Sequence, residues 1–124
     1  MFIDATINGK AAKSVMIDTG ATHNFISVME AQRLGLKLDK DPGRMKAVNS
    51  KALATTGVAK QVRVKIGTWE GLTDLIAVQL DDFDVILGMD FLMEKGGIPI
   101  PAAGSLVLMG EQPAVVSAKV RHAS

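Results

Sequence analysis

Apolar and polar residues alternate with a period of two along much of the chain. Val62, Val64 and Ile66 alternate with two basic residues, and a second apolar-rich run follows over residues 72–80. This period is typical of a strand with one buried face. Residues 67–71 between the runs have turn chemistry, so we expect a hairpin. On its second strand four residues are expected to share one face: Leu72, Ile76, Val78 and Leu80.

The N-terminal segment has the same character. Apolar runs over Phe2–Ile7 and Ala11–Ile17 flank an Asn8-Gly9 pair. Asn-Gly favours a tight hairpin because both residues tolerate positive φ. The second of these strands is therefore expected to run directly into Asp18.

Helix signals are short. Ser27 and Glu30 fit a capping box and Gly35 fits a C-terminal cap, which predicts a helix over Val28–Leu34. A second candidate helix covers Gly88–Lys95 and stops at two glycines.

The remaining segments are read as loops and strands. Asp39–Arg44 is read as a polar loop, and Ile98–Pro101 as extended chain because each proline disfavours a helical residue before it. Ser105–Met109 and Val115–Val120 are predicted strands. The pattern indicates an all-β domain with one or two short helices.

Length and composition narrow the possible functions. The 124 residues fit one domain, 1–124, and 14 basic against 13 acidic residues give a net charge of +1. This balance predicts no nucleic-acid partner, and no apolar run approaches the roughly 20 residues of a membrane helix. The first residues resemble no signal peptide, so an intracellular, cytoplasmic location is expected. With no Cys and only two His, we expect no metal and no cofactor.

Asp18-Thr19-Gly20 is the segment most suggestive of chemistry. It follows the apolar run Val15–Ile17, so the strand delivers a carboxylate at the end of a buried segment. A similar apolar run before a glycine recurs at Asp84–Gly88, without a carboxylate at the turn. Asp18 alone would also fit an ordinary turn-capping residue.

The surrounding residues resemble a known family. Met16–Ser27 and Asp84–Leu92 resemble the retropepsin family of aspartic proteases, especially the protease segment of gypsy-type LTR retrotransposon polyproteins of plants. The resemblance covers about residues 3–109 and leaves a C-terminal strand and tail at 110–124. It implies a closed acid-protease barrel, one lobe of a two-fold dimer. It also implies an aspartic endopeptidase that cleaves a Gag-Pol-like polyprotein in a retrotransposon particle.

The chemistry of that family needs two carboxylates. Two acids a few Å apart cannot both ionise, so one holds a proton while the other acts as base. This chain has one Asp-Thr-Gly and is too short for a two-lobed enzyme. The second carboxylate must then be Asp18 of another copy, which predicts a homodimer.

Neighbouring residues receive roles in the same way. Gly20 lets the backbone pass close to the carboxylates. The resemblance implies that Thr19 hydrogen-bonds across the dimer and that Ala21 lines the substrate cleft, although Thr19 also fits a turn hydroxyl. Residues 86–88 are expected to support the loop by packing. Asn24 fits a structural role in the loop as well as a catalytic one.

A retropepsin also closes a hairpin flap over its substrate. The candidate flap lies between Met45 and Thr56, with Asn49, Ser50 and Lys51 at its tip as substrate-binding residues. An ordinary surface hairpin fits this segment equally well.

Two other functions fit the same residues. One is a host protease of the ubiquitin-shuttle type, with the same chemistry and another substrate. The other is a catalytically silent retropepsin fold that binds peptides or assists assembly. The intact Asp18-Thr19-Gly20 favours an active enzyme.

Overall fold

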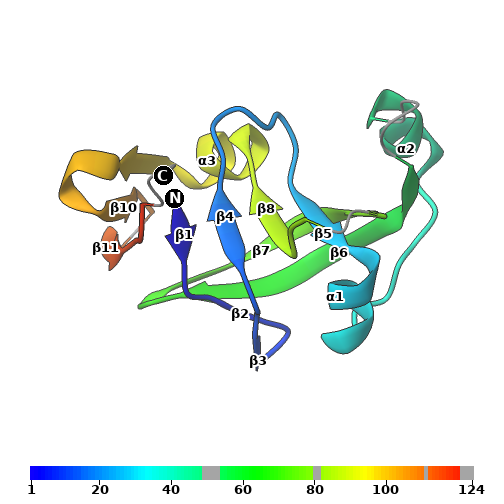
Figure 1. Cartoon of the computed structure of the whole chain (residues 1–124), viewed down its shortest axis with the longest axis horizontal. Helices are drawn as coiled ribbons and strands as arrows, with labels where there is room; N and C mark the ends of the chain where they lie inside the picture. Colours follow the sequence, from blue (N-terminus) through cyan, green and yellow to red (C-terminus); the bar gives the residue numbers. More distant parts are fainter. Residues whose placement is uncertain (49–53, 80–81, 111, 121–124) are drawn as a thin grey trace.

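The computed structural model describes residues 1–48, 54–79, 82–110 and 112–120. Its strands are, in chain order, β1 (Phe2–Ile3), β2 (Thr6–Ile7), β3 (Lys10–Ala11), β4 (Val15–Ile17), β5 (Phe25–Ser27), β6 (Thr55–Ile66), β7 (Trp69–Val78), β8 (Val85–Leu87), β9 (Gly97–Ile100), β10 (Ser105–Leu108) and β11 (Ala114–Ser117). A larger sheet has the order β1-β4-β8-β5-β7-β6-β2-β3 and a smaller one the order β11-β10-β9 (Figure 1). The larger sheet curls into a half-barrel, which confirms the expected all-β acid-protease fold.

The two similar sequence segments lie side by side in the larger sheet, next to its β1 edge. β4 pairs in parallel with β8, in a register that places Met16 beside Ile86 and Ile17 beside Leu87. β5 then pairs with the other edge of β8. The chain therefore brings the end of β4, where Asp18 follows, next to the end of β8.

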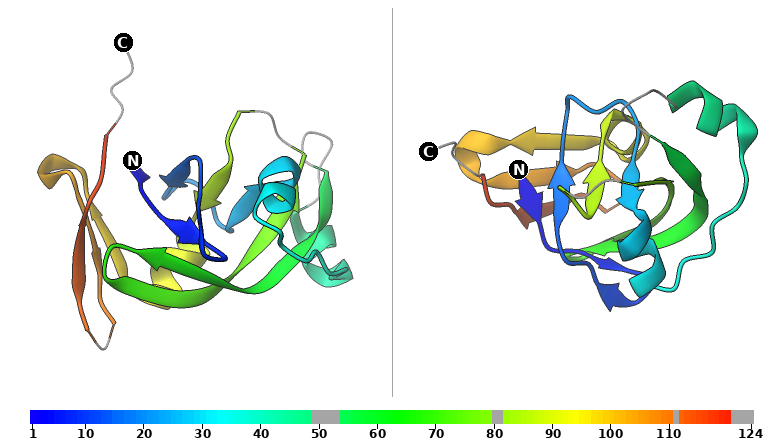
Figure 2. Two further views of the ribbon diagram at one scale, coloured as in Figure 1. Left: turned by 90° about the horizontal axis from the view of Figure 1, so that it is seen from below. Right: turned by 45° about the vertical axis from the view of Figure 1, so that its right-hand side comes forward.

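The long β6–β7 hairpin crosses the molecule from end to end (Figure 2). Its turn is tighter than expected, because only Gly67 and Thr68 separate the strands and β7 begins at Trp69. Gly67 has a φ of 57°, in the left-handed region that glycine adopts without strain.

The predicted face of β7 exists but lies partly outside the core. Ile76 and Val78 are buried in a small second cluster with Val58, whereas Leu72 is 43% exposed. Leu75 on the opposite face is fully buried in the main core. The alternation of apolar and polar residues correctly predicted which residues of β7 share a face, but it did not predict which face packs against the main core. Leu80 lies outside the described residues.

The N-terminal hairpin confirms the Asn8-Gly9 signal. Both residues have positive φ, 54° and 77°, and they join β2 to β3. The two long strands predicted here are each broken, and β1 pairs with β4 instead. Ile3, Ile7 and Val15 are buried and contribute to the main core.

Both predicted helices form. α1 (Val28–Arg33) begins after Ser27, whose Oγ accepts the Glu30 amide at 3.1 Å. α3 (Met89–Lys95) ends at Gly96, which has a φ of 63°. A short 3-10 turn, η1 (Pro101–Ala103), connects β9 to β10.

A third helix, α2 (Pro42–Val48), was not predicted. It replaces the end of the expected polar loop and the first arm of the expected flap hairpin, so both predictions are wrong there. Proline suits a first helical position, and the Asp41 side chain accepts the Arg44 amide at 3.3 Å. Local capping thus favours a helix although α2 buries no residue.

α1 is fixed to the sheet by a buried carboxylate. The Glu30 side chain is 2% exposed and accepts hydrogen bonds from Arg33 Nε at 2.6 Å and from the Lys13 amide at 2.9 Å. The hydrogen bond from Arg33 is the main reason that the pKa of Glu30 lies below its ordinary value; burial acts in the opposite direction.

The smaller sheet joins the two ends of the described chain. β11 is shorter than the predicted strand, since it ends at Ser117. Phe2 then forms an antiparallel bridge with Lys119. Ile98 and Val115 flank Val107 in the register of β9, β10 and β11, and they are 50% and 71% exposed. One face of this sheet is therefore apolar and open.

Candidate active site

Asp18 lies at the start of the loop that joins β4 to β5 and rises at the top of Figure 1. Buried Val15 and Ile17 anchor β4, and the Asp18 side chain that follows is half-buried. Its Oδ1 accepts the Gly20 amide at 2.8 Å, and its own carbonyl accepts the Ala21 amide at 3.2 Å. The carboxylate is therefore held in a tight turn at the end of a rigid strand.

β8 and α3 brace this loop from the neighbouring strand. The Asp18 amide donates to the Leu87 carbonyl at 3.1 Å, and the Met89 amide donates to the Ala21 carbonyl at 2.8 Å. At Gly88 an added Cβ would lie 2.6 Å from the Ala21 carbonyl oxygen and closer still to that of His23. Only glycine permits this approach, so residues 86–88 support the loop as expected.

Asn24 connects the loop to two other elements. Its side chain is buried, and its Oδ1 accepts the amides of Gly88 at 3.0 Å and Phe91 at 3.2 Å. Its Nδ2 donates to Thr73 Oγ1 at 3.3 Å and to the Asp74 carbonyl at 3.4 Å. Asn24 thus caps the N-terminus of α3 from outside the helix. The sequence did not predict this role, because the partners of Asn24 lie far from it along the chain.

The hydrogen-bond chain continues to α2. Asp74 Oδ1 accepts the Gln61 amide at 2.7 Å, and Asp74 Oδ2 accepts Arg44 Nη1 at 2.6 Å. Burial raises the pKa of Asp74, but these two donors outweigh it, and the pKa lies below its ordinary value. Gln61 has a φ of 53° at an irregularity in β6, where Asp74 satisfies its amide.

The other predicted site residues lie either on the Asp18 loop or outside the described residues. Thr19 and Gly20 are exposed and Ala21 is half-buried, all on the same loop as Asp18. Their catalytic and substrate-binding roles stay predictions. Asn49, Ser50 and Lys51, the predicted flap tip, lie outside the described residues.

The described parts of the chain contain no group of three or more His, Cys, Asp or Glu side chains placed to hold a metal ion. None of the helices that the structure describes has the length and apolar character needed to cross a membrane.

This fold, with Asp-Thr-Gly at the end of β4, defines the retropepsin class of aspartic proteases. The chain belongs to the retroviral aspartyl protease family, whose family model matches residues 4–109. No curated protein matches the chain by sequence.

Solved structures show the same fold. The retroviral protease-like domain of Ddi1 from Leishmania major is similar with a TM-score of 0.77 and 17% identity, over 96% of this chain and 94% of that one. EIAV protease complexed with the inhibitor HBY-793 is similar with a TM-score of 0.63 and 19% sequence identity, over 81% of this chain and 91% of that one. A retropepsin-like aspartic protease from Rickettsia conorii is similar with a TM-score of 0.52 and 21% sequence identity, over 94% of this chain and 81% of that one.

Proposed function

We propose that the protein is an aspartic endopeptidase whose active site forms when two copies bring their Asp18 side chains together. The observation that carries this proposal is one half-buried carboxylate, held at a strand end by the Gly20 amide and by the bracing strand β8. One carboxylate cannot act as both acid and base in the same step. A second copy supplies the missing group.

The pair would hydrolyse a peptide bond with a single shared proton. The ionised carboxylate takes a proton from a water molecule, and the water oxygen attacks the peptide carbonyl carbon. The protonated carboxyl gives its proton to the carbonyl oxygen, which becomes a hydroxyl. When the C–N bond breaks, the leaving amine takes the proton that the first carboxylate accepted from water. One hydroxyl of the intermediate gives its proton to the other carboxylate as the carbonyl is restored, so the pair again holds a single proton. The two apparent pKa values then belong to the pair.

We place the contact between copies on the open apolar face of the smaller sheet, around Ile98 and Val115. Burial of such side chains favours association by about 25 cal/mol per Å². The Ile98→Asp and Val115→Asp variants should therefore sediment as monomers under conditions where the unmodified protein dimerises. A dimer that persists in both would move the contact elsewhere without affecting the role of Asp18.

The proposed substrate is an extended segment of a Gag-Pol-like polyprotein, and the proposed location is cytoplasmic, within a retrotransposon particle. Activity that depends on dimerisation rises with concentration. Dilute precursors would remain inactive until assembly concentrates them.

Replacement of Asp18 by Asn tests the proposal. The matched control is Asp4→Asn, because Asp4 is exposed and follows β1 at the end of the β1–β4 pair opposite Asp18. Asp18→Asn should abolish cleavage of a peptide library and Asp4→Asn should not, with both variants folded by circular dichroism. Unchanged cleavage by Asp18→Asn would refute the catalytic assignment.

Sedimentation and pH dependence test the shared proton. The protein should dimerise at micromolar concentration, or on addition of pepstatin, and its rate should follow a bell-shaped pH profile. A rate that rises steadily into alkaline pH would contradict the mechanism. A monomer that binds neither peptide nor pepstatin would instead favour the catalytically silent module.

A host protease of the ubiquitin-shuttle type is the second candidate. The similarity of the fold to the Ddi1 domain, over 96% of this chain, supports it. The two candidates share the chemistry of Asp18 and differ in substrate. Cleavage of polyubiquitin-conjugated proteins rather than of the polyprotein would favour the host protease.

A further inference from the structure

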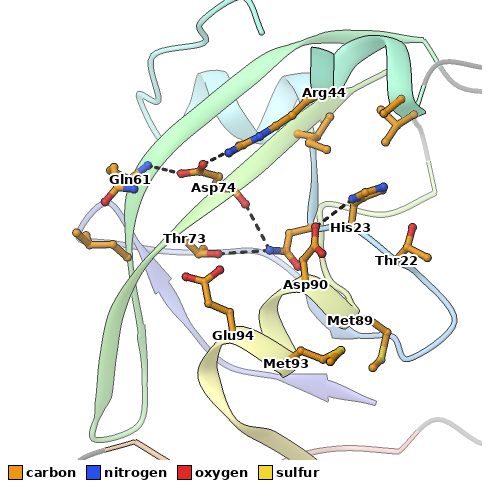
Figure 3. Close-up of a pocket in the computed structure, with 15 residues that line it drawn as sticks. Thr22, His23, Arg44, Gln61, Thr73, Asp74, Met89, Asp90, Met93 and Glu94 are labelled. Carbon is orange, nitrogen blue, oxygen red and sulfur yellow. Dashed lines mark hydrogen bonds and ion pairs between the residues drawn. The ribbon is translucent and has the colours of Figure 1, made fainter. Parts of the chain in front are cut away.

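A pocket of about 760 Å³ lies beside the catalytic loop (Figure 3). Its walls come from four parts of the chain: the loop at Thr22–Asn24, helix α2, the β6–β7 hairpin and one side of α3. The loop residues in its wall follow Asp18 by only four to six positions. Four residues of chain span at most about 14 Å, so an extended peptide of several residues bound over Asp18 is long enough to reach the pocket.

The charges that line the pocket are mostly negative. The carboxylates of Asp74, Asp90 and Glu94 and the guanidinium of Arg44 line it, which gives a formal charge of −3 + 1 = −2 from its Asp, Glu, Lys and Arg residues. Arg44 is occupied by Asp74 at 2.6 Å. The Asp74 hydrogen bond is the main cause of a raised pKa of Arg44, and Asp90 adds to it from α3.

The two acids on α3 remain accessible. Asp90 and Glu94 are four residues apart, so they lie on the same side of the helix. Their side chains are 60% and 64% exposed. Asp90 pairs with His23 at 3.0 Å and Glu94 pairs with Lys95 at 3.0 Å, and the side chains of these two partners are 35% and 18% exposed. Because both carboxylates themselves are largely exposed, each can accept a further hydrogen bond from a ligand cation.

Apolar side chains complete the pocket. Met93 is 77% exposed and Leu72 is 43% exposed, and Met89 and Ile76 also line the wall. Exposed apolar groups beside polar ones are typical of ligand sites. The aliphatic stem of a Lys or Arg side chain can lie on such a surface while its charged end reaches a carboxylate. The flexible side chain of methionine can adapt to the stem of either a Lys or an Arg.

We infer that this pocket binds a basic side chain of the peptide substrate at a position outside the two residues that flank the cut bond. The inference rests on the proposed protease function and adds a determinant of specificity to it. Glu94 and Asp90 attract the cation, and the same charges repel an acidic residue at that position. Specificity would thus depend on α3 as well as on the loop of Asp18.

Peptides that differ at one outer position test the inference. Each has the same apolar centre and carries Arg, norleucine or Glu, scanned in turn over the outer positions on both sides. At one position kcat/KM should favour Arg over norleucine roughly two- to fivefold, the upper part of the range for exposed ion pairs. Glu94→Gln should remove most of this preference and leave cleavage of the norleucine peptide unchanged.

Glu70→Gln is the matched control, because Glu70 is an exposed acid paired with Arg63 on the β6–β7 hairpin and is not part of the pocket wall. It should retain the full preference for Arg. An equal loss in Glu70→Gln and Glu94→Gln would show a general effect of net charge and would overturn the inference.

Binding to the Asp18→Asn variant separates this inference from the proposed function. Fluorescence anisotropy of the labelled Arg and norleucine peptides should show the same preference without cleavage. Selective binding that Glu94→Gln abolishes, in a protein that cleaves nothing, would support the pocket and refute the protease. Cleavage with no preference at any outer position would refute the pocket alone, and peptides that are neither bound nor cleaved would refute both.

Discussion

Replacement of Asn24 by alanine removes every hydrogen bond by which this side chain ties the loop of Asp18 to the start of α3 and to β7. Two of these bonds satisfy the amides of Gly88 and Phe91, which are buried. The alanine side chain has no hydrogen-bond acceptor. A water molecule has little space to replace the lost acceptor, because the Gly88 backbone packs closely against the carbonyls of Ala21 and His23. Both amides would then be buried without partners.

The expected cost follows from these two amides. A buried donor left without a partner costs about 1–3 kcal/mol, so the pair costs about 4 kcal/mol. That is a large part of the roughly 5–15 kcal/mol by which a domain of this size is stable. It corresponds to a fall in Tm of roughly 10–20 °C.

Thermal unfolding followed by circular dichroism measures this fall. Thr73→Val is an internal control, because it removes one partner of Nδ2 and leaves both amides bonded; it should cost about 1 kcal/mol. Gln32→Ala, on an exposed position of α1, should change stability by less than about 0.5 kcal/mol. An Asn24→Ala protein that melts within about 3 °C of the unmodified chain would refute the reasoning.

Two further predictions concern the supports of the loop and of α1. Gly88→Ala should lower stability by at least about 1–3 kcal/mol, because its Cβ overlaps the carbonyls of the Asp18 loop, and it should reduce the proposed proteolytic activity. Gly43→Ala in exposed α2 meets nothing closer than 3.9 Å and should be neutral or stabilising in urea unfolding. Glu30→Gln should destabilise the protein at neutral pH. Because the pKa of Glu30 is lowered in the folded protein, the ionised carboxylate contributes to stability above the ordinary glutamate pKa near 4.5, and this contribution is lost as the pH falls through the folded-state pKa. The urea midpoints of the unmodified and Glu30→Gln proteins should therefore converge in acid. A difference that stays constant with pH would contradict the role of the Arg33 pair.

Local signals predicted the elements that local forces stabilise. The Asn8-Gly9 turn and the capped helix α1 could be inferred because the deciding residues are neighbours in the sequence. α2 is the exception: Asp41 caps it locally, but it was missed because it has no apolar periodicity and because Arg44 also holds it through Asp74, thirty residues away. Leu72 was misjudged because the second cluster that buries the same face ends before it.

The candidate site divides in the same way. Asp18 and Gly88 were identified from short motifs, and the structure brings their segments together. The capping of α3 by Asn24 could not be inferred, since its partners lie 49 to 67 residues away and no sequence pattern links an asparagine to a distant amide. Surface pockets formed by four separate elements, such as the one beside α3, are likewise invisible in sequence.

The parallel pairing of β4 with β8 also determines when the loop of Asp18 can take shape. The paired residues Val15 and Val85 are separated by 70 positions. At synthesis rates of about 5–20 residues per second, β8 leaves the ribosome roughly 4–14 s after β4. Until then the nascent polypeptide has neither the Leu87 carbonyl nor the amides of α3 to arrange the loop. Translation order itself therefore delays the folding of the Asp18 loop until β8 and α3 have emerged.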